Sequence, residues 1–211
     1  MSKTRLLTVL LLAGLGIVLA GCKGKKPLPK SPAPAKDGGE TAVKEAPDFA
    51  LTDHNGRQVK LADYSGQIVV LEWLNYDCPF VKPHYEAGTF ANLAGKYADK
   101  GVTWLTVNST EYATGQTNKA WAQKYNLTRP ILDDRAGKVG RLFGATNTPH
   151  MYIIDTAGKI VYEGAIDNAP LGKVEGEYVN YVDKALAELT AGKSVSVART
   201  KAYGCTVKYA N

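Results

Sequence analysis

Apolar segments typical of buried strands alternate with helical patterns along most of this chain, and this alternation restricts the fold more than any other feature. Ile68–Trp73 and Val102–Val107 are strand-like runs, and Val81–Tyr97 between them has a helical pattern. Strand–helix–strand units of this kind predict an α/β fold, with a mixed central sheet and helices on both of its faces. Further predicted elements are two helices and two strands joined in a hairpin, at Asn118–Tyr125, Glu175–Leu189, Met151–Asp155 and Lys159–Glu163.

Segments near the edges of this pattern are predicted to be turns, loops or extensions. Phe49–Leu51 and Gln58–Leu61 flank the turn sequence Asp53-His54-Asn55-Gly56, and together they predict an N-terminal β-hairpin. Ser109–Gln116 is polar and contains glycine, so we expect an exposed loop there. The residues after Leu189 are expected to form a C-terminal extension of the domain.

The beginning of the chain has the layout of an export signal. Lys3 and Arg5 precede the apolar run Leu6–Leu19, which is shorter than the ~20 residues that a membrane-spanning helix needs. The tetrapeptide Leu19-Ala20-Gly21-Cys22 follows, and it resembles the lipobox of bacterial lipoproteins. This resemblance implies a signal peptide over residues 1–21, cleavage before Cys22, and lipid attached to that cysteine. The alternative is an ordinary signal peptide whose cleavage site falls near a cysteine.

Residues 22–45 are predicted to be the lipidated cysteine and a disordered tether, which leads to a domain over residues 46–211. The tether is rich in proline and lysine and offers too little apolar surface to offset the entropy of ordering it. The net charge of +6 lies entirely within residues 1–44, so the domain itself is neutral and no nucleic-acid partner is expected. We therefore expect a protein of the cell envelope that contacts the membrane through its lipid. Lys23 after the lipidated cysteine favours the outer membrane if the cell is Gram-negative.

Cys78 is the residue whose position most suggests chemistry. It follows the strand-like run Ile68–Trp73 directly and precedes the predicted helix, with Pro79 suited to the first helical position. The positive end of a helix favours a thiolate, which is the reactive form of cysteine. The alternative is a buried and inert cysteine, which is common in protein cores.

Three motifs carry a resemblance to a known family. Ala46-Pro47-Asp48-Phe49, then Asp77-Cys78-Pro79 after the first long strand, and finally the run Thr148–Asp155 occur in an order and spacing similar to those of the peroxiredoxin-like alkyl hydroperoxide reductase and redoxin group. The similarity spans about residues 45–190. It implies a thioredoxin-like fold with a cis-proline at Pro149 beside the active cysteine. Pro149 would then shape the substrate groove, and Thr148 would offer backbone hydrogen bonds beside the sulfur.

The resemblance implies an enzyme, a thiol-dependent oxidoreductase of the antioxidant type, in which Cys78 is the attacking thiolate. Cys78-Pro79-Phe80-Val81 has valine where a CxxC motif would close, so the second sulfur has to come from elsewhere. Cys205 is the expected resolving cysteine, carried on a mobile C-terminal arm with Gly204 as its pivot. No dissociable cofactor is expected, because a reducing thiol protein would supply the electrons. One alternative is thiol–disulfide exchange with envelope proteins, and another is a non-enzymatic binding module with a structural Cys78–Cys205 disulfide.

The substrate is open between a peroxide and a protein disulfide. Peroxiredoxins carry a proline and a hydroxyl residue ahead of the attacking cysteine, at places where this chain has Leu71 and Asn75. Asn75 would therefore have to orient a peroxide in place of the hydroxyl. Trp73 is a candidate for lining the same pocket, with packing as its alternative role. Arg129 and Arg141 are candidates for the arginine of that family.

No metal site is predicted. His54, His84 and His150 lack metal-ligand spacing among themselves. Cys78 with His84 is distantly similar to copper-delivery proteins of the same fold, but Lys82 stands where those proteins have a second cysteine.

Overall fold

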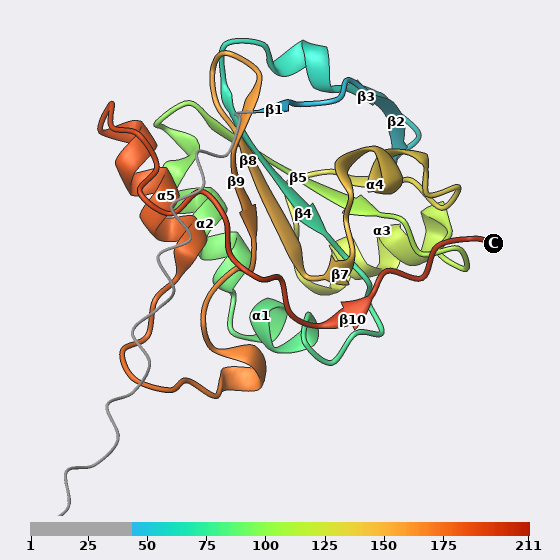
Figure 1. Ribbon diagram of the computed structural model, residues 1–211. Coiled ribbons are helices and arrows are strands. Elements are labelled where there is room, and N and C mark those ends of the chain that lie inside the picture. Colours follow the sequence, from blue (N-terminus) through green and yellow to red (C-terminus); the bar gives the residue numbers. More distant parts are fainter. Residues whose placement is uncertain (1–43) are drawn as a thin grey trace, which may run out of the picture. The chain divides into compact units, whose positions relative to one another are not determined.

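A mixed sheet of eight strands forms the centre of the molecule (Figure 1). The computed structural model describes residues 44–211, so the predicted signal peptide, Cys22 and nearly all of the predicted tether lie outside the described residues. The strands lie in the order β1-β9-β8-β4-β5-β6-β2-β3. Their bounds are β1 Lys44–Glu45, β2 Ala50–Asp53, β3 Gln58–Lys60, β4 Ile68–Trp73, β5 Val102–Asn108, β6 Ile131–Asp133, β8 His150–Ile154 and β9 Lys159–Gly164.

Strand β4 is the central strand, and its composition explains this position. All six of its residues are buried, which fits the apolar run that predicted it. It pairs in parallel with β5 and antiparallel with β8, with Trp73 opposite His150. The predicted hairpins are also present, because β2 pairs with β3 across the Asp53–Gly56 turn and β8 pairs with β9.

Helices cover both faces of the sheet, as the α/β prediction requires. The helices are α1 Lys82–Glu86, α2 Thr89–Ala98, α3 Gly115–Lys124, α4 Lys138–Phe143 and α5 Tyr181–Thr190. One core contains Val70 and Leu74 with residues of α1, α2, α3 and α5. The other contains Leu71 and Trp73 with residues of α4 and the N-terminal hairpin. Among residues 44–211, none of the helices has the length and apolar character needed to cross a membrane.

Several predicted boundaries differ from the structure. The helix predicted over Val81–Tyr97 is two helices, α1 and α2, because the chain turns at Gly88, whose φ of +70° favours glycine. The last helix begins at Tyr181 rather than Glu175, where the Asn180 side chain accepts a hydrogen bond from Asp183 N. Lys44 and Glu45 were predicted to be tether, and instead they pair with β9.

The loop predicted over Ser109–Gln116 is only partly exposed. Ser109 and Thr110 are completely buried, and α3 already begins at Gly115 after a capping Thr114. Burial of the Ser109 hydroxyl is tolerated because it accepts a hydrogen bond from Trp73 Nε1 at 3.1 Å and donates one to Asp134 at 2.6 Å. The polar composition of the loop therefore reflects internal hydrogen bonds as well as contact with water.

A buried charged network links β4 to the helix that follows Cys78. The Glu72 carboxylate, which is fully buried, pairs with Arg129 at 3.1 Å and accepts hydrogen bonds from Tyr85 at 2.6 Å and Trp104 at 2.8 Å. Burial, with the charge of Glu72 as the next cause, raises the pKa of Tyr85 well above its usual value, so its hydroxyl remains a donor. Because Tyr85 belongs to α1, this network fixes α1 against the central strand.

We predict that Arg129→Met destabilises the protein by about 3–5 kcal/mol, because it leaves the buried Glu72 carboxylate without its counter-charge. Chemical denaturation of the full chain measures this loss. Lys96→Met is the control, since it removes an exposed ion pair with Asp183 and should cost less than about 1 kcal/mol. Equal losses for the two variants would show that the buried pair has no special role.

Candidate functional site

The candidate site is the loop that leaves β4 and carries Cys78. The backbone turns there because Cys78 N donates to Asn75 O at 3.1 Å and Val81 N donates to Cys78 O at 3.0 Å. The Asn75 side chain tightens the same turn by accepting a hydrogen bond from Asp77 N at 2.8 Å. The turn directs the Cys78 side chain inward, where it is only 2% exposed.

A second loop meets Cys78 at the same edge of the sheet. Because β8 runs antiparallel to β4, the residues that precede β8 lie beside the residues that follow β4. The Cys78 thiol donates a hydrogen bond to the Thr148 carbonyl at 3.0 Å. The Thr148–Pro149 peptide bond is cis, as the family resemblance implies.

The C-terminal segment brings Cys205 to this place. It forms a two-stranded antiparallel sheet in which β10 (Cys205–Thr206) pairs with β7 (Asn147–Thr148), and Cys205 lies opposite Thr148. Figure 1 shows this segment passing α1 and β7 on its way to the C-terminus. Gly204 has a φ of +109°, and a Cβ atom there would collide with the Thr148 carbonyl oxygen. Only glycine therefore fits where the segment crosses the loop.

The C-terminal segment, which we predicted to be a mobile arm with a pivot at Gly204, is bonded to the rest of the domain along its length and forms a belt. We define this belt as residues 198–210. Its first part is bonded to β9, through Thr200 N donating to Glu163 O at 3.0 Å. Its last part is bonded to α4 and the residues after it, through Tyr209 OH donating to Ala145 O at 2.7 Å and the Arg141 guanidinium over the Tyr209 ring at 4.6 Å. Backbone pairing with β7 holds the middle, so Cys205 lies beside the Cys78 loop without any movement of the chain.

The two cysteines differ in their exposure and in their ease of ionisation. Both are free thiols, Cys78 is buried and Cys205 is half-buried. Burial raises the pKa of Cys205 to about 11, the neighbouring Cys78 adds to this increase, and Lys208 opposes it. Cys205 is therefore a protonated thiol at neutral pH.

The helix end that we predicted for Cys78 is not formed as expected. Helix α1 begins at Lys82, and the proline in its first turn is Pro83, whereas Pro79 lies in the turn before the helix. The side chain of Cys78 instead contacts the Thr148 carbonyl. A reactive role for Cys78 therefore depends on the loops around it rather than on a helix of five residues.

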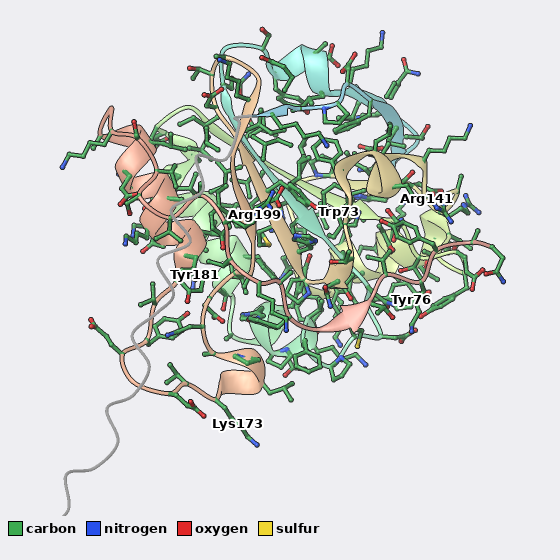
Figure 2. The ribbon with its side chains drawn as sticks, viewed as in Figure 1. Trp73, Tyr76, Arg141, Lys173, Tyr181 and Arg199 are labelled. Carbon is green, nitrogen blue, oxygen red and sulfur yellow. The ribbon has the colours of Figure 1, made fainter. Side chains whose placement is uncertain are left out.

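The residues proposed to bind a peroxide are engaged elsewhere. The Asn75 side chain accepts from Asp77 N and donates to Tyr112 OH at 3.3 Å. Trp73 is fully buried in the centre of the molecule (Figure 2). Its ring contacts the rings of Phe143 and Tyr152. The two candidate arginines are paired with Glu72 and stacked on Tyr209, respectively, and their hydrogen-bond partners do not include either cysteine.

Each of the three histidines has its own hydrogen-bond partner in a different part of the structure. His54 Nδ1 accepts from Ile131 N at 3.0 Å, and His150 Nδ1 accepts from Thr146 N at 3.2 Å. His84 Nε2 lies 2.9 Å from the hydroxyl of Tyr203, in the C-terminal belt. Within residues 44–211, the His, Cys, Asp and Glu side chains form no group of three that would hold a metal ion.

A polar cluster beside Cys205 could not be predicted from the sequence. Tyr203 OH donates to Asp167 Oδ1 at 2.7 Å, and Asp167 is buried at 3% exposure. The same hydroxyl meets His84, which lies in α1 just after the Cys78 loop. These residues are far apart in the chain, so no local pattern could connect them. The one available signal was the sequence Tyr203-Gly204-Cys205, which places an aromatic hydroxyl two residues before the second thiol.

A buried thiol beside a cis-proline loop, on a mixed sheet with helices on both faces, defines a redoxin with a thioredoxin-like fold. The chain belongs to the AhpC/TSA family, whose model matches residues 42–163. That match includes Cys78 and the cis-proline loop, whereas the belt with Cys205 lies beyond it.

Known proteins support this placement and narrow the chemistry. The Thiol-disulfide oxidoreductase ResA of Bacillus thuringiensis subsp. konkukian is 31% identical over 121 residues, which cover 57% of this chain and 67% of that protein. An uncharacterized conserved protein from Geobacillus kaustophilus has a solved structure with 30% identity and a TM-score of 0.73, covering 80% of this chain and 92% of that one. The thioredoxin domain of a thiol-disulfide oxidoreductase from Bacteroides vulgatus shares the fold, at 21% identity and a TM-score of 0.51, over 57% of this chain and 86% of that one. The name of the first of these proteins describes thiol–disulfide exchange.

We predict that His150, which follows the cis-proline, makes the protein sensitive to acid. Burial lowers the pKa of His150 to about 4 in the folded protein, from an ordinary value of 6.5. Between these values only the unfolded chain binds the proton, so the free energy of unfolding decreases as the pH falls, by about 3 kcal/mol in total.

The variant His150→Asn tests this prediction by urea denaturation at several pH values between 7 and 4. Asparagine offers an oxygen to Thr146 N but does not titrate in this range. The variant should lose about 3 kcal/mol less than the native protein over this range. The same loss in both proteins would assign the acid sensitivity to other groups.

Proposed function

We propose that this protein is a thiol–disulfide oxidoreductase whose redox pair is Cys78 and Cys205. The observation that carries the proposal is the pairing of β10 with β7. It sets Cys205 opposite Thr148, and the carbonyl of Thr148 is the acceptor for the Cys78 thiol. Cys205 also packs against the core cluster that contains Cys78, which is further support.

The proposed reaction begins with the Cys78 thiolate attacking one sulfur of a disulfide in a protein substrate. A mixed disulfide forms on Cys78, and the other substrate sulfur leaves as a thiolate and takes up a proton. Cys205 then loses its proton and attacks Cys78 Sγ, which forms the Cys78–Cys205 disulfide and releases the second substrate thiol. The substrate gains two electrons and two protons, and the two cysteines lose them. A reducing thiol protein would restore both cysteines by the reverse exchange, so no dissociable cofactor is needed.

The difference between the two cysteines supports these roles. Cys205, with a pKa of about 11, is protonated at neutral pH and is a poor nucleophile toward free substrates. Cys78 is buried beside the β7–β10 pair, and in the proposed cycle a substrate reaches it when the middle of the belt moves away from β7. A permanent Cys78–Cys205 staple would use the same proximity, and turnover separates the two alternatives.

Peroxide reduction is the weaker alternative for this site. Its main requirement is a side chain that orients the peroxide beside the attacking sulfur, and Asn75 was the candidate. Both ends of the Asn75 amide already have partners within the protein. The names of the relatives also describe disulfide exchange.

We predict that the reduced full-length protein reduces a protein disulfide and that Cys78→Ser lowers this activity to the uncatalysed rate. Cys205→Ser should stop after the first step and retain the substrate as a mixed disulfide on Cys78, which mass spectrometry detects. Hydrogen peroxide offered in parallel should be consumed no faster than by free cysteine. Rapid peroxide consumption that depends on Cys78 would restore the peroxidase alternative. Full activity in Cys78→Ser would end the proposal.

The proposed function also includes a location at the cell envelope, held by lipid on Cys22. The support is the order of positively charged residues, apolar run and lipobox-like tetrapeptide in the first part of the sequence. A lipid anchor with a long tether would let the redox site reach protein substrates at a distance from the membrane. In a Gram-negative cell, Lys23 favours the outer membrane.

We predict that Cys22→Ser moves the protein from the membrane fraction to the soluble fraction of its cells, because the lipid attachment site is lost. Cell fractionation followed by immunodetection measures this change. Cys78→Ser, which leaves the first part of the chain untouched, is the control and should remain with the membrane. Unchanged membrane retention of the Cys22→Ser variant would contradict a lipid anchor at this residue.

A further inference from the structure

The hydroxyl of Tyr203 lies at the centre of a hydrogen-bonded cluster that joins three separate parts of the molecule. It donates to Asp167 Oδ1 at 2.7 Å, in the segment after β9, and lies 2.9 Å from His84 Nε2, in α1. Asp167 also accepts from Ala169 N at 2.9 Å and from Tyr178 OH at 3.1 Å, so both of its carboxylate oxygens have donors within the protein. Tyr203 is therefore attached to a rigid acceptor.

The directions of these hydrogen bonds follow from the donors available. A tyrosine hydroxyl has one hydrogen, and a carboxylate can only accept, so this hydrogen points at Asp167. His84 Nε2 therefore carries a hydrogen and donates it to the Tyr203 oxygen. Burial lowers the pKa of His84, so the imidazole is neutral with its hydrogen on Nε2 at neutral pH. Burial, followed by Asp167, raises the pKa of Tyr203 far above its usual value, so the hydroxyl keeps its hydrogen.

The ring of Tyr203 adds apolar contacts to these hydrogen bonds. It packs against Phe80 at 6.1 Å between ring centres and against the ring of His84 at 6.4 Å. Phe80 belongs to the Cys78 loop, two residues after the thiol. Tyr203 thus contacts two places in the chain that follows Cys78, the Cys78 loop and α1, and it stands two residues before Cys205 in the belt.

We propose that Tyr203 is the positioning residue that holds Cys205 over Cys78, through its hydroxyl contacts with Asp167 and His84. This inference rests on the proposed redox pair of Cys78 and Cys205. It adds that the Tyr203 side chain keeps the two sulfurs close together. When the contact is made, the belt lies on β7 and closes access to Cys78. When it breaks, the middle of the belt is free to leave, and Cys78 becomes accessible to a substrate.

If Tyr203 has this role, the equilibrium between the Cys78–Cys205 disulfide and the two free thiols depends on the Tyr203 hydroxyl. Holding two thiols together raises their effective concentration and favours the disulfide over the dithiol. Loss of a hydrogen bond to a charged acceptor should weaken this preference roughly tenfold. We therefore expect Tyr203→Phe to make the disulfide roughly tenfold easier to reduce, and to make Cys78 in the reduced protein react several times faster with iodoacetamide.

The experiment equilibrates the full-length protein with glutathione redox buffers and measures each cysteine by peptide mass spectrometry. Tyr209→Phe is the matched control, because it also removes one hydroxyl from the belt, but the hydroxyl contacts a neutral carbonyl far from Tyr203. The control should keep the native equilibrium within about twofold. Gly204→Ala is a second variant. It keeps the Tyr203 hydroxyl but adds a Cβ atom that collides with the Thr148 carbonyl oxygen and forces the belt away from it. It should shift the equilibrium in the same direction as Tyr203→Phe.

The outcomes separate this inference from the proposed function. A tenfold shift in Tyr203→Phe with a native equilibrium in Tyr209→Phe supports the positioning role. A native equilibrium in Tyr203→Phe, or equal shifts in both tyrosine variants, overturns the role of Tyr203 while the redox pair stands. If the native protein forms no Cys78–Cys205 disulfide in any of these buffers, the proposed redox pair itself is wrong.

Discussion

The antiparallel pairing of β4 with β8 is the constraint on which the candidate site depends. It places the end of β4 beside the beginning of β8, with Trp73 opposite His150, so the loops that carry Cys78 and Thr148 meet at one edge of the sheet. In a parallel pair these two loops would lie at opposite edges. The buried Glu72 carboxylate also fixes the helix that follows the Cys78 loop, because Tyr85 in α1 donates a hydrogen bond to it and so holds α1 against β4. The geometry around Cys78 is therefore set by the core of the protein.

The belt occupies the backbone hydrogen-bonding groups at this edge through the pairing of β10 with β7. The backbone groups of Asn147 and Thr148 would otherwise be free to pair with an extended chain, and β10 occupies them. A substrate bound there in an extended conformation would need the same groups. Under the proposed function, the belt and such a substrate exclude one another, and a substrate reaches Cys78 only when the segment that carries Cys205 moves.

Features set by neighbouring residues in the sequence could be predicted, whereas features set by contacts between distant residues could not. The central strand Ile68–Trp73 was predicted with the bounds that the structure has, because six consecutive buried residues give a strong local signal. The helix after Cys78 was predicted as one, because its break depends on the backbone conformation of Gly88 alone. The family resemblance correctly implied the cis peptide before Pro149, which composition could not show.

The belt could not be predicted in this way, because its contacts are long-range. Tyr203 bonds to His84 across 119 positions of the chain and to Asp167 across 36. Short polar and aromatic segments near a C-terminus have no local pattern that requires a strand. Glycine before Cys205 was interpreted as a pivot, and the structure shows that it is needed for close contact with the Thr148 carbonyl. The sequence alone does not distinguish a glycine needed for close approach from a glycine needed for movement.

The environment of Cys205 gives a physical reason for an order of events under the proposed function. Burial is the main cause of its raised pKa, and the neighbouring Cys78 contributes the next part through a hydrogen bond and its charge. Once Cys78 carries a substrate sulfur in a mixed disulfide, its sulfur has no charge and is a weaker acceptor for the Cys205 hydrogen. The contribution of Cys78 then decreases, whereas Lys208, which lowers the pKa, remains. Cys205 is therefore easiest to ionise after the mixed disulfide has formed, which is the step at which it has to attack.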